Sequence, residues 1–315
     1  MSLFKANEPR MNMVMLLFWG ACFSISIAKN VFYTLSYGNT NLEITSEALA
    51  ELQGCGRIAP YSNSPREYTL ASNQISVFSG FKPFNTLRRH TFYQQLLNPN
   101  RNWPVHHLEL HGAASDFNFE WLRVGNVCKL ISTQPLQDQV DFEETVIRGG
   151  LQRQLDGIGL KFLYDLVGVD FVQSQDLFIY DLAAVPKMYV PTKIQTTSDL
   201  QEVTELMKEQ SDSVMSGELS VVEIGIDQER IDLFHNVPAS AGKVPEDENL
   251  SYTDSGYRID VNDFSGFLVV TSETYSNTQV YCENTPSDTL DSYHVNLIQT
   301  GIVVPENCVS MRIDF

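Results

Sequence analysis

The sequence predicts an α+β fold dominated by β-strands, with a mixed strand and helix part followed by a smaller acidic β-sheet or sandwich. Short runs rich in β-branched and aromatic residues recur between turn residues, and they are most regular toward the C-terminus. Two or three helices are expected in the first part, and the second part begins with the clearest helix of the chain. With 315 residues, the chain is long enough to bury a core in one large domain or two ordinary ones.

Charge divides the chain near residue 196. Residues 197–315 hold 22 of the 39 acidic residues but 5 of the 21 basic ones, so almost all of the net charge of −18 lies there. The predicted organisation is therefore a signal peptide over residues 1–28, a β-rich α+β domain over 29–196 and an acidic helix-plus-β domain over 197–315. Such an acidic part repels nucleic acid and anionic membranes, and it attracts basic partners or cations.

Residues 1–28 have the pattern of a secretory signal peptide. Lys5 and Arg10 precede an apolar run over residues 11–18, and the segment ends with small residues at Ser26 and Ala28, where a signal peptidase reads them. We therefore expect cleavage after Ala28 and a secreted, periplasmic or extracellular protein.

Two alternatives to a cleaved peptide stay open at the N-terminus. The tripeptide that ends at Cys22 resembles the end of a bacterial lipoprotein signal, in which Cys22 would carry the lipid. Residues 11–28 could also stay attached as an anchor, although this length is at the short limit for crossing a bilayer. Contact with a membrane is expected only through one of these two routes.

The cysteines agree with export. The mature chain would carry an even number of them, Cys55, Cys128, Cys282 and Cys308, and none shows the C-x-x-C spacing of zinc or redox sites. We expect disulfides Cys55–Cys128 and Cys282–Cys308, because this pairing keeps each bridge within one half of the chain. The alternative is four buried thiols.

In the first domain, turn residues and apolar spacing predict both strands and helices. Thr45 and Asn85 are each expected to cap a helix. Strands are expected over residues 31–37, one or two over 68–81, two or three over 103–131, and several over 160–191. Residues 142–155 are expected to be helical, although Gly149 and Gly150 lie in the middle and disfavour a helix.

The second domain opens with the clearest helix of the chain. Ser198 and Gln201 have the spacing of a capping box, and apolar residues then recur at helical spacing, at Leu200, Val203, Leu206 and Met207. A strand over 218–226, a short helix over 227–234 and an acidic loop over 238–254 are expected next. Five short strands should follow, over residues 257–261, 266–271, 279–282, 293–299 and 309–313.

One stretch of the first domain carries side chains that suit a metal. His107, Glu109 and His111 alternate with leucines, so a β-strand would place all three on one face. Two imidazoles and a carboxylate suit zinc or non-haem iron and leave positions for water or substrate. The competing interpretation is that these residues are the solvated face of an ordinary strand.

Two acidic segments of the second domain suit calcium or a basic partner. The first contains Glu246, Asp247 and Glu248, and the second contains Asp260 and Asp263. Their oxygen-rich side chains suit Ca²⁺ outside cells, but neither segment fits the twelve-residue calcium loop. A solvated acidic loop is the competing interpretation.

The sequence therefore favours a non-enzymatic binding protein that works outside the cytoplasm. Its acidic domain would engage a basic protein partner, as an inhibitor, an immunity-type antagonist of a toxin, or a surface or virion component does. The sequence contains no nucleophile elbow and no recognisable cysteine and histidine pair. The alternative function is a metal-dependent hydrolase or oxygenase built on His107, Glu109 and His111.

Overall fold

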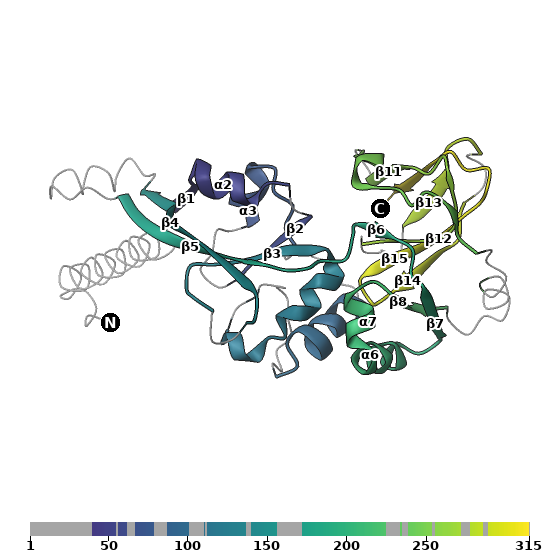
Figure 1. Cartoon of the computed structure of the whole chain (residues 1–315), viewed down its shortest axis with the longest axis horizontal. Coiled ribbons are helices and arrows are strands. Elements are labelled where there is room, and N and C mark those ends of the chain that lie inside the picture. The colour runs from purple at the N-terminus through teal and green to yellow at the C-terminus, as the bar shows by residue number, and fades with distance from the viewer. Residues whose placement is uncertain are drawn as a thin grey trace, which may run out of the picture.

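Three β-sheets supply most of the regular structure, which confirms the expected β-dominated α+β fold (Figure 1). The computed structural model describes residues 40–54, 56–61, 67–78, 87–100, 110, 112–136, 140–155, 172–224, 234, 239–253, 256–271, 278–285 and 289–314. The signal peptide expected over residues 1–28 and the strand expected over residues 31–37 lie outside this part of the chain.

The first sheet has five strands in the order β1-β4-β5-β3-β2. The strands are β1 (Thr40–Ile44), β2 (Arg57–Pro60), β3 (Val127–Ser132), β4 (Glu143–Leu155) and β5 (Val172–Asp181). Within this sheet, β2 and β3 are the only described neighbours that run parallel to each other. Helices α2 (Ser46–Leu52) and α3 (Glu67–Ser72) contribute Ala48, Leu52 and Leu70 to a core that they share with this sheet.

The expected helix over residues 142–155 is wrong, because this segment is strand β4. Its pairing with β5 shifts in register between Ile147 and Leu151, and Gly149 lies in this shift with φ of +64°. The backbone N–H of Gly149 donates to the Asp176 carboxylate at 2.9 Å. The glycine pair therefore accommodates a bulge in a long antiparallel ladder, where a helix would have lost stability.

Other local expectations for the first half had mixed outcomes. Thr45 caps α2 as expected, with its hydroxyl accepting from the Ala48 N–H. The expected helix after Asn85 is present as α4 (Leu87–Thr91), and it continues as a π-helix, η1 (Phe92–Leu97). The strands expected over residues 68–81 are wrong for the described residues 68–78, where α3 covers the start and only Val77 makes an isolated bridge.

The stretch 103–131 contains less strand than expected. Among its described residues, the short 3-10 helices η2 (Ala114–Asp116) and η3 (Phe119–Gly125) precede β3. Phe119 and Leu122 are buried three residues apart on η3, and so are Trp121 and Val124, which is the spacing of a helix. Residues 119–125 therefore form a helix because their apolar side chains pack against the core, although their aromatic content alone favours a strand.

The remaining strands form two sheets that pack on a common core. The seven-stranded sheet contains β6 (Met188–Tyr189), β7 (Lys193–Thr197), β8 (Leu219–Glu223), β9 (Ala241–Gly242), β12 (Phe264–Val270), β14 (Ser292–Val295) and β15 (Gln299–Val304). The four-stranded sheet contains β10 (Leu250–Tyr252), β11 (Gly256–Asp260), β13 (Gln279–Cys282) and β16 (Ser310–Asp314). Leu268 and Ile302 of the larger sheet share one hydrophobic cluster with Val280 and Met311 of the smaller. The strands expected over residues 218–226, 257–261, 266–271, 279–282 and 309–313 are present as β8, β11, β12, β13 and β16. The strand expected over 293–299 is only partly present, because β14 ends at Val295 and a turn leads into β15, which was not expected.

Helix α6 (Leu200–Glu209) confirms the clearest helix of the sequence, and α7 (Ser211–Met215) follows it. Val203 and Met207 are buried against the core, as the apolar spacing predicts. The expected capping residue is wrong by one position, because Asp199 rather than Ser198 caps the helix and accepts from the Gln201 N–H at 2.7 Å. The Thr197 hydroxyl accepts from the Asp199 N–H at 3.1 Å, which fixes this start.

The change in charge at residue 197 does not coincide with a break in packing. One hydrophobic cluster contains Trp121 and Leu130 of the first half together with Met207 and Val221 of the second. Strands β6 and β7 precede residue 198, yet they pair with β12 and β8. The division into two domains at residue 196 stays a prediction.

A buried polar network joins the halves. The Gln299 amide oxygen accepts from the Tyr189 hydroxyl and from the Asn296 side chain, both at 2.8 Å. Its amide nitrogen donates to the Val124 carbonyl at the end of η3, also at 2.8 Å. Asn296 in turn accepts from the Val221 N–H at 2.8 Å. One buried amide side chain thus connects η3, β6 and β15, and burial prevents these polar groups from bonding to solvent instead.

We expect Gln299→Ala to lower the free energy of unfolding by about 3 kcal/mol, because the buried Val124 carbonyl loses the amide that donates to it. The Tyr189 hydroxyl also loses its bond at 2.8 Å and keeps only contacts at 3.4 Å to Ser220 and Asn296. Gln210→Ala is the matched control, since its amide bonds Gln195 in a half-buried position and its loss should cost below about 1 kcal/mol. Urea unfolding of both variants measures the difference. Equal losses of unfolding free energy in the two variants would show that the buried network stabilises the protein no more than a half-buried hydrogen bond does.

The pH dependence of stability tests the same network. Burial raises the pKa of Tyr189 to about 12, while its hydrogen bonds lower it in part. Because the pKa of Tyr189 is higher in the folded than in the unfolded protein, the neutral hydroxyl contributes to the free energy of unfolding. This contribution is complete below about pH 10 and is lost as pH rises toward about 12. The free energy of unfolding should therefore fall less steeply above about pH 10 in Tyr189→Phe than in the parent. Denaturant titrations at several pH values measure this free energy. An equally steep fall with pH in both proteins would contradict the prediction.

Candidate functional site

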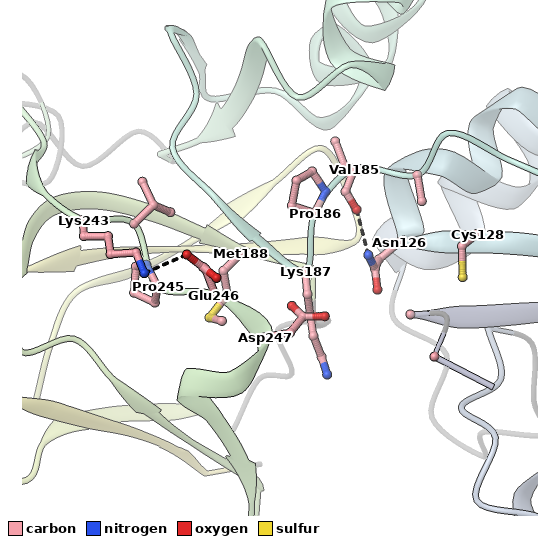
Figure 2. Close-up of a pocket in the computed structure, with 14 residues that line it drawn as sticks. Asn126, Cys128, Val185, Pro186, Lys187, Met188, Lys243, Pro245, Glu246 and Asp247 are labelled. Atoms are coloured by element: carbon pink, nitrogen blue, oxygen red, sulfur yellow. Dashed lines mark hydrogen bonds and ion pairs between the residues drawn. The ribbon is translucent and has the colours of Figure 1, made fainter.

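A cleft of about 640 Å³ lies where the two halves of the chain meet (Figure 2). Gly56, Asn126 and Cys128 of the first half line one side of it. The connector, residues 184–188 between β5 and β6, lines its middle. Residues 243–247, which precede β10, line the other side. The cleft therefore depends on segments that are far apart in the sequence.

Asn126 holds the first end of the connector. It follows η3 in the left-handed region, with φ of 57°, and its side-chain nitrogen donates to the Val185 carbonyl at 2.7 Å. A Cβ on Gly56 would lie 2.1 Å from the Asn126 amide oxygen, so only glycine leaves room for this side chain. Arg123 adds a second contact, donating from Nε to the Ala183 carbonyl at 2.8 Å.

Thr271 holds the second end of the connector. Its backbone N–H and its hydroxyl both donate to the Lys187 carbonyl, at 2.9 and 3.2 Å. The Lys187 side chain extends to the Tyr252 hydroxyl, to which Nζ donates at 3.1 Å. The connector is thus fixed by hydrogen-bonded side chains of both halves, and the cleft is formed before any ligand binds.

The acidic turn, residues 246–248, belongs to the wall opposite Asn126. Asn249 accepts from the Glu246 N–H at 2.8 Å, and the Glu246 carboxylate accepts from Lys243 Nζ at 2.8 Å. The hydrogen bond and the charge of Glu246 raise the pKa of Lys243. Asp247 and Glu248 are exposed, and within the described part of the chain neither carboxylate makes a hydrogen bond or ion pair. The turn therefore presents two exposed carboxylates without a direct partner among the described residues, although the charge of Glu248 also contributes to the raised pKa of Lys243.

The predicted acidic residues are only partly brought together. Glu246 and Asp247 line the cleft, with Glu248 next to them. Asp260 instead ends β11 and accepts from the Asn262 N–H, while the Asp263 carbonyl accepts from the Lys243 N–H at 3.0 Å. Over the described ranges, no three His, Cys, Asp or Glu side chains come close enough to hold a metal ion. Calcium binding stays a prediction.

The predicted metal ligands His107, Glu109 and His111 lie outside the described residues. Leu110, between the last two of them, is buried and bridges to Tyr61, as expected for a core-facing leucine. The Tyr61 hydroxyl donates to the Gly112 carbonyl at 2.6 Å. Burial and the nearby charge of Asp116 raise the pKa of Tyr61. The metal hypothesis for this stretch stays a prediction.

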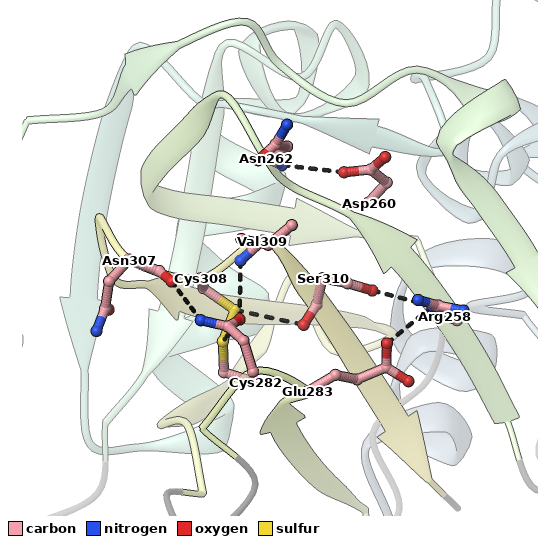
Figure 3. The surroundings of a disulfide bond; sticks show 10 residues. Arg258, Asp260, Asn262, Cys282, Glu283, Asn307, Cys308, Val309 and Ser310 are labelled. Atoms are coloured by element: carbon pink, nitrogen blue, oxygen red, sulfur yellow. Dashed lines mark hydrogen bonds and ion pairs between the residues drawn. A yellow bond between two sulfur atoms is a disulfide. The ribbon is translucent and has the colours of Figure 1, made fainter.

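One predicted disulfide is confirmed. Cys282 at the end of β13 is bonded to Cys308, and both residues are buried (Figure 3). Asn284 holds the same turn, because its side chain accepts from the Val309 N–H at 3.0 Å and donates to the Asn307 carbonyl at 2.6 Å. This bond ties the segment that precedes β16 to the neighbouring strand.

Cys128, in the cleft, is also disulfide-bonded. Its predicted partner, Cys55, lies outside the described residues, so the pairing Cys55–Cys128 stays a prediction. Disulfides persist in oxidising compartments, and this property fits a protein that works outside the cytoplasm. In the described part of the chain, no helix is long and apolar enough to span a membrane.

Comparison with known protein families, with curated proteins and with solved structures found no match to this chain.

Sequence reasoning missed the cleft residues Asn126, Val185 and Lys187. Asn126 follows a glycine in a turn pattern, and Pro186 interrupts the chain between two strands, so both positions carried a local turn signal. Nothing in the local pattern indicated that these turns meet the acidic turn in space.

We expect Cys282→Ser with Cys308→Ser to lower the free energy of unfolding by about 3.5 kcal/mol, because the bond closes a loop with a sequence separation of 26. Reductant should then destabilise this double variant less than the parent. Thermal unfolding with and without reductant measures both effects. An unchanged midpoint in the variant would contradict a stabilising role.

Proposed function

We propose that this chain is an exported, non-enzymatic binding protein whose cleft and acidic C-terminal half engage a basic polypeptide partner. A secreted inhibitor, an immunity-type antagonist and a surface or virion component would all work in this way. Export through the signal segment over residues 1–28 belongs to the same proposal.

The observation that carries the proposal is the acidic turn in the wall of the cleft. Asp247 and Glu248 are exposed carboxylates next to a concave surface of about 640 Å³. A lysine or arginine side chain that enters the cleft can pair with them without breaking an internal ion pair among the described residues. Charge complementarity of this kind speeds encounter with a partner and sets its orientation.

The overall charge of the second half supports the same proposal. Three basic residues of the second half already pair with acids, Lys243 with Glu246, Arg258 with Glu283 and Arg312 with Asp314. Most of the other acidic residues that the structure describes in this half are exposed, including Glu209 and Asp212 at the junction of α6 and α7. The field of this half is therefore negative over a wide surface, and it favours approach of cationic chains.

The test is binding of a short synthetic lysine-rich peptide to the full chain. Asp247→Asn with Glu248→Gln should weaken binding by about tenfold at low salt, because two exposed charge pairs are lost. The loss should shrink as salt is added, since surface charges are screened. Isothermal titration calorimetry at two ionic strengths measures both effects.

Glu209→Gln with Asp212→Asn is the matched control. It removes the same two charges from exposed positions that do not line the cleft, and within the described residues neither carboxylate makes an ion pair or hydrogen bond. We expect this control to change affinity by less than about twofold. Equal losses in both double variants would show that only overall charge matters, and absence of binding would refute the proposal.

A further inference from the structure

A second, smaller pocket continues from the cleft. It has a volume of about 60 Å³ and shares Gly56, Asn126 and Lys187 with the cleft. Among the described residues that line it, the charged ones are Arg57 and Lys187, and none is a carboxylate. Hydroxyl groups complete it, from Ser76, Tyr252, Tyr257 and Thr271. In a chain with a net charge of −18, this pocket is a local reversal of charge.

The two cations are held in place by neighbours in the fold. Arg57, at the start of β2, donates from Nη1 to the Gly125 carbonyl at 3.2 Å. Lys187 Nζ lies 5.1 Å from the centre of the Tyr252 ring and donates to its hydroxyl at 3.1 Å. The Tyr257 ring meets the Tyr252 ring edge-on at 5.3 Å. Lys187 therefore stands at the point where the cleft and the pocket join, with its ammonium group supported by an aromatic face.

The size of the pocket limits what it can hold. About 60 Å³ is roughly the volume of two water molecules in the liquid, which is enough for a carboxylate group but not for a ring or a long side chain. Two cationic side chains and hydroxyl donors form the strongest hydrogen bonds with an anion. The pocket is thus suited in charge and in size to a single small anionic group.

We infer that this pocket binds a carboxylate of the peptide partner, with Arg57 and Lys187 as its counter-charges. The inference rests on the proposed function, because the same peptide would place its basic side chains against the acidic turn. Glu246 and Asp247 line the cleft, and Arg57 lines the pocket that continues from it. A ligand that carries both charges satisfies both regions, so the partner is a basic segment with a carboxylate, at its chain end or on a side chain.

The experiment compares three lysine-rich peptides of the same sequence on the full chain. One has an unblocked carboxyl terminus, one is amidated, and one is amidated and ends in glutamate. The unblocked peptide should bind about tenfold more tightly than the amidated one, as a charge-assisted pair in a pocket requires. A matching gain with glutamate assigns the site to any carboxylate, and no gain with glutamate assigns it to the chain end.

Lys187→Gln should abolish the difference between the peptides, and it removes no buried apolar group. Arg57→Gln should do the same, but Arg57 also supports Gly125, so unfolding midpoints of both variants are measured alongside. Lys208→Gln is the matched control, because Lys208 is exposed on α6 and does not line either space. The control should keep the full difference between the peptides.

The outcomes separate this inference from the proposed function. If all three peptides bind the parent equally well, the carboxylate site is refuted while binding of a basic partner stands. A carboxylate preference that survives in Lys187→Gln also refutes it, because the group then binds elsewhere. If no peptide binds, the proposed function fails and the inference fails with it.

Discussion

The buried amide of Gln299 is the constraint on which the arrangement of the two halves depends. It satisfies Tyr189, Asn296 and the Val124 carbonyl at once, all within hydrogen-bond distance. A buried polar group without a partner is costly, so each of these groups fixes the position of the others. The apolar cluster around them supplies most of the stabilisation, but apolar contacts alone tolerate sliding. The amide specifies how η3, β6 and β15 meet.

The cleft is a direct consequence of this joint. The connector runs from β5 into β6, and Tyr189 of β6 belongs to the network. Asn126 and Thr271 hold the connector on either side of Pro186. A site formed in this way is ordered before binding, so a ligand does not have to order the connector. The residues that shape the site are therefore hydrogen-bonded turns, while the charged side chains extend from them into the solvent.

Charge is separated across the site as well as along the chain. The acidic turn belongs to the part that carries most of the negative charge, whereas Arg57 comes from β2 of the nearly neutral first half. Lys187 lies between them and is common to the cleft and the smaller pocket. Such a site distinguishes ligands by where their charges lie, and this property gives orientation as well as attraction.

The sequence by itself determined the features that arise within one segment. The β-dominated composition, strands β11, β12, β13 and β16, helix α6 and the bond between Cys282 and Cys308 were predicted, because local periodicity, turn residues and cysteine count report them directly. Strands β10 and β15 were not predicted. Only the tertiary structure decided β4, where pairing with β5 over nine positions outweighed an apparently helical pattern. It also decided the cleft, since Asn126, Lys187 and Asp247 meet only when distant turns are packed together. Short-range patterns carry no information on such contacts, because the free energy that forms them comes from packing between segments far apart in the chain.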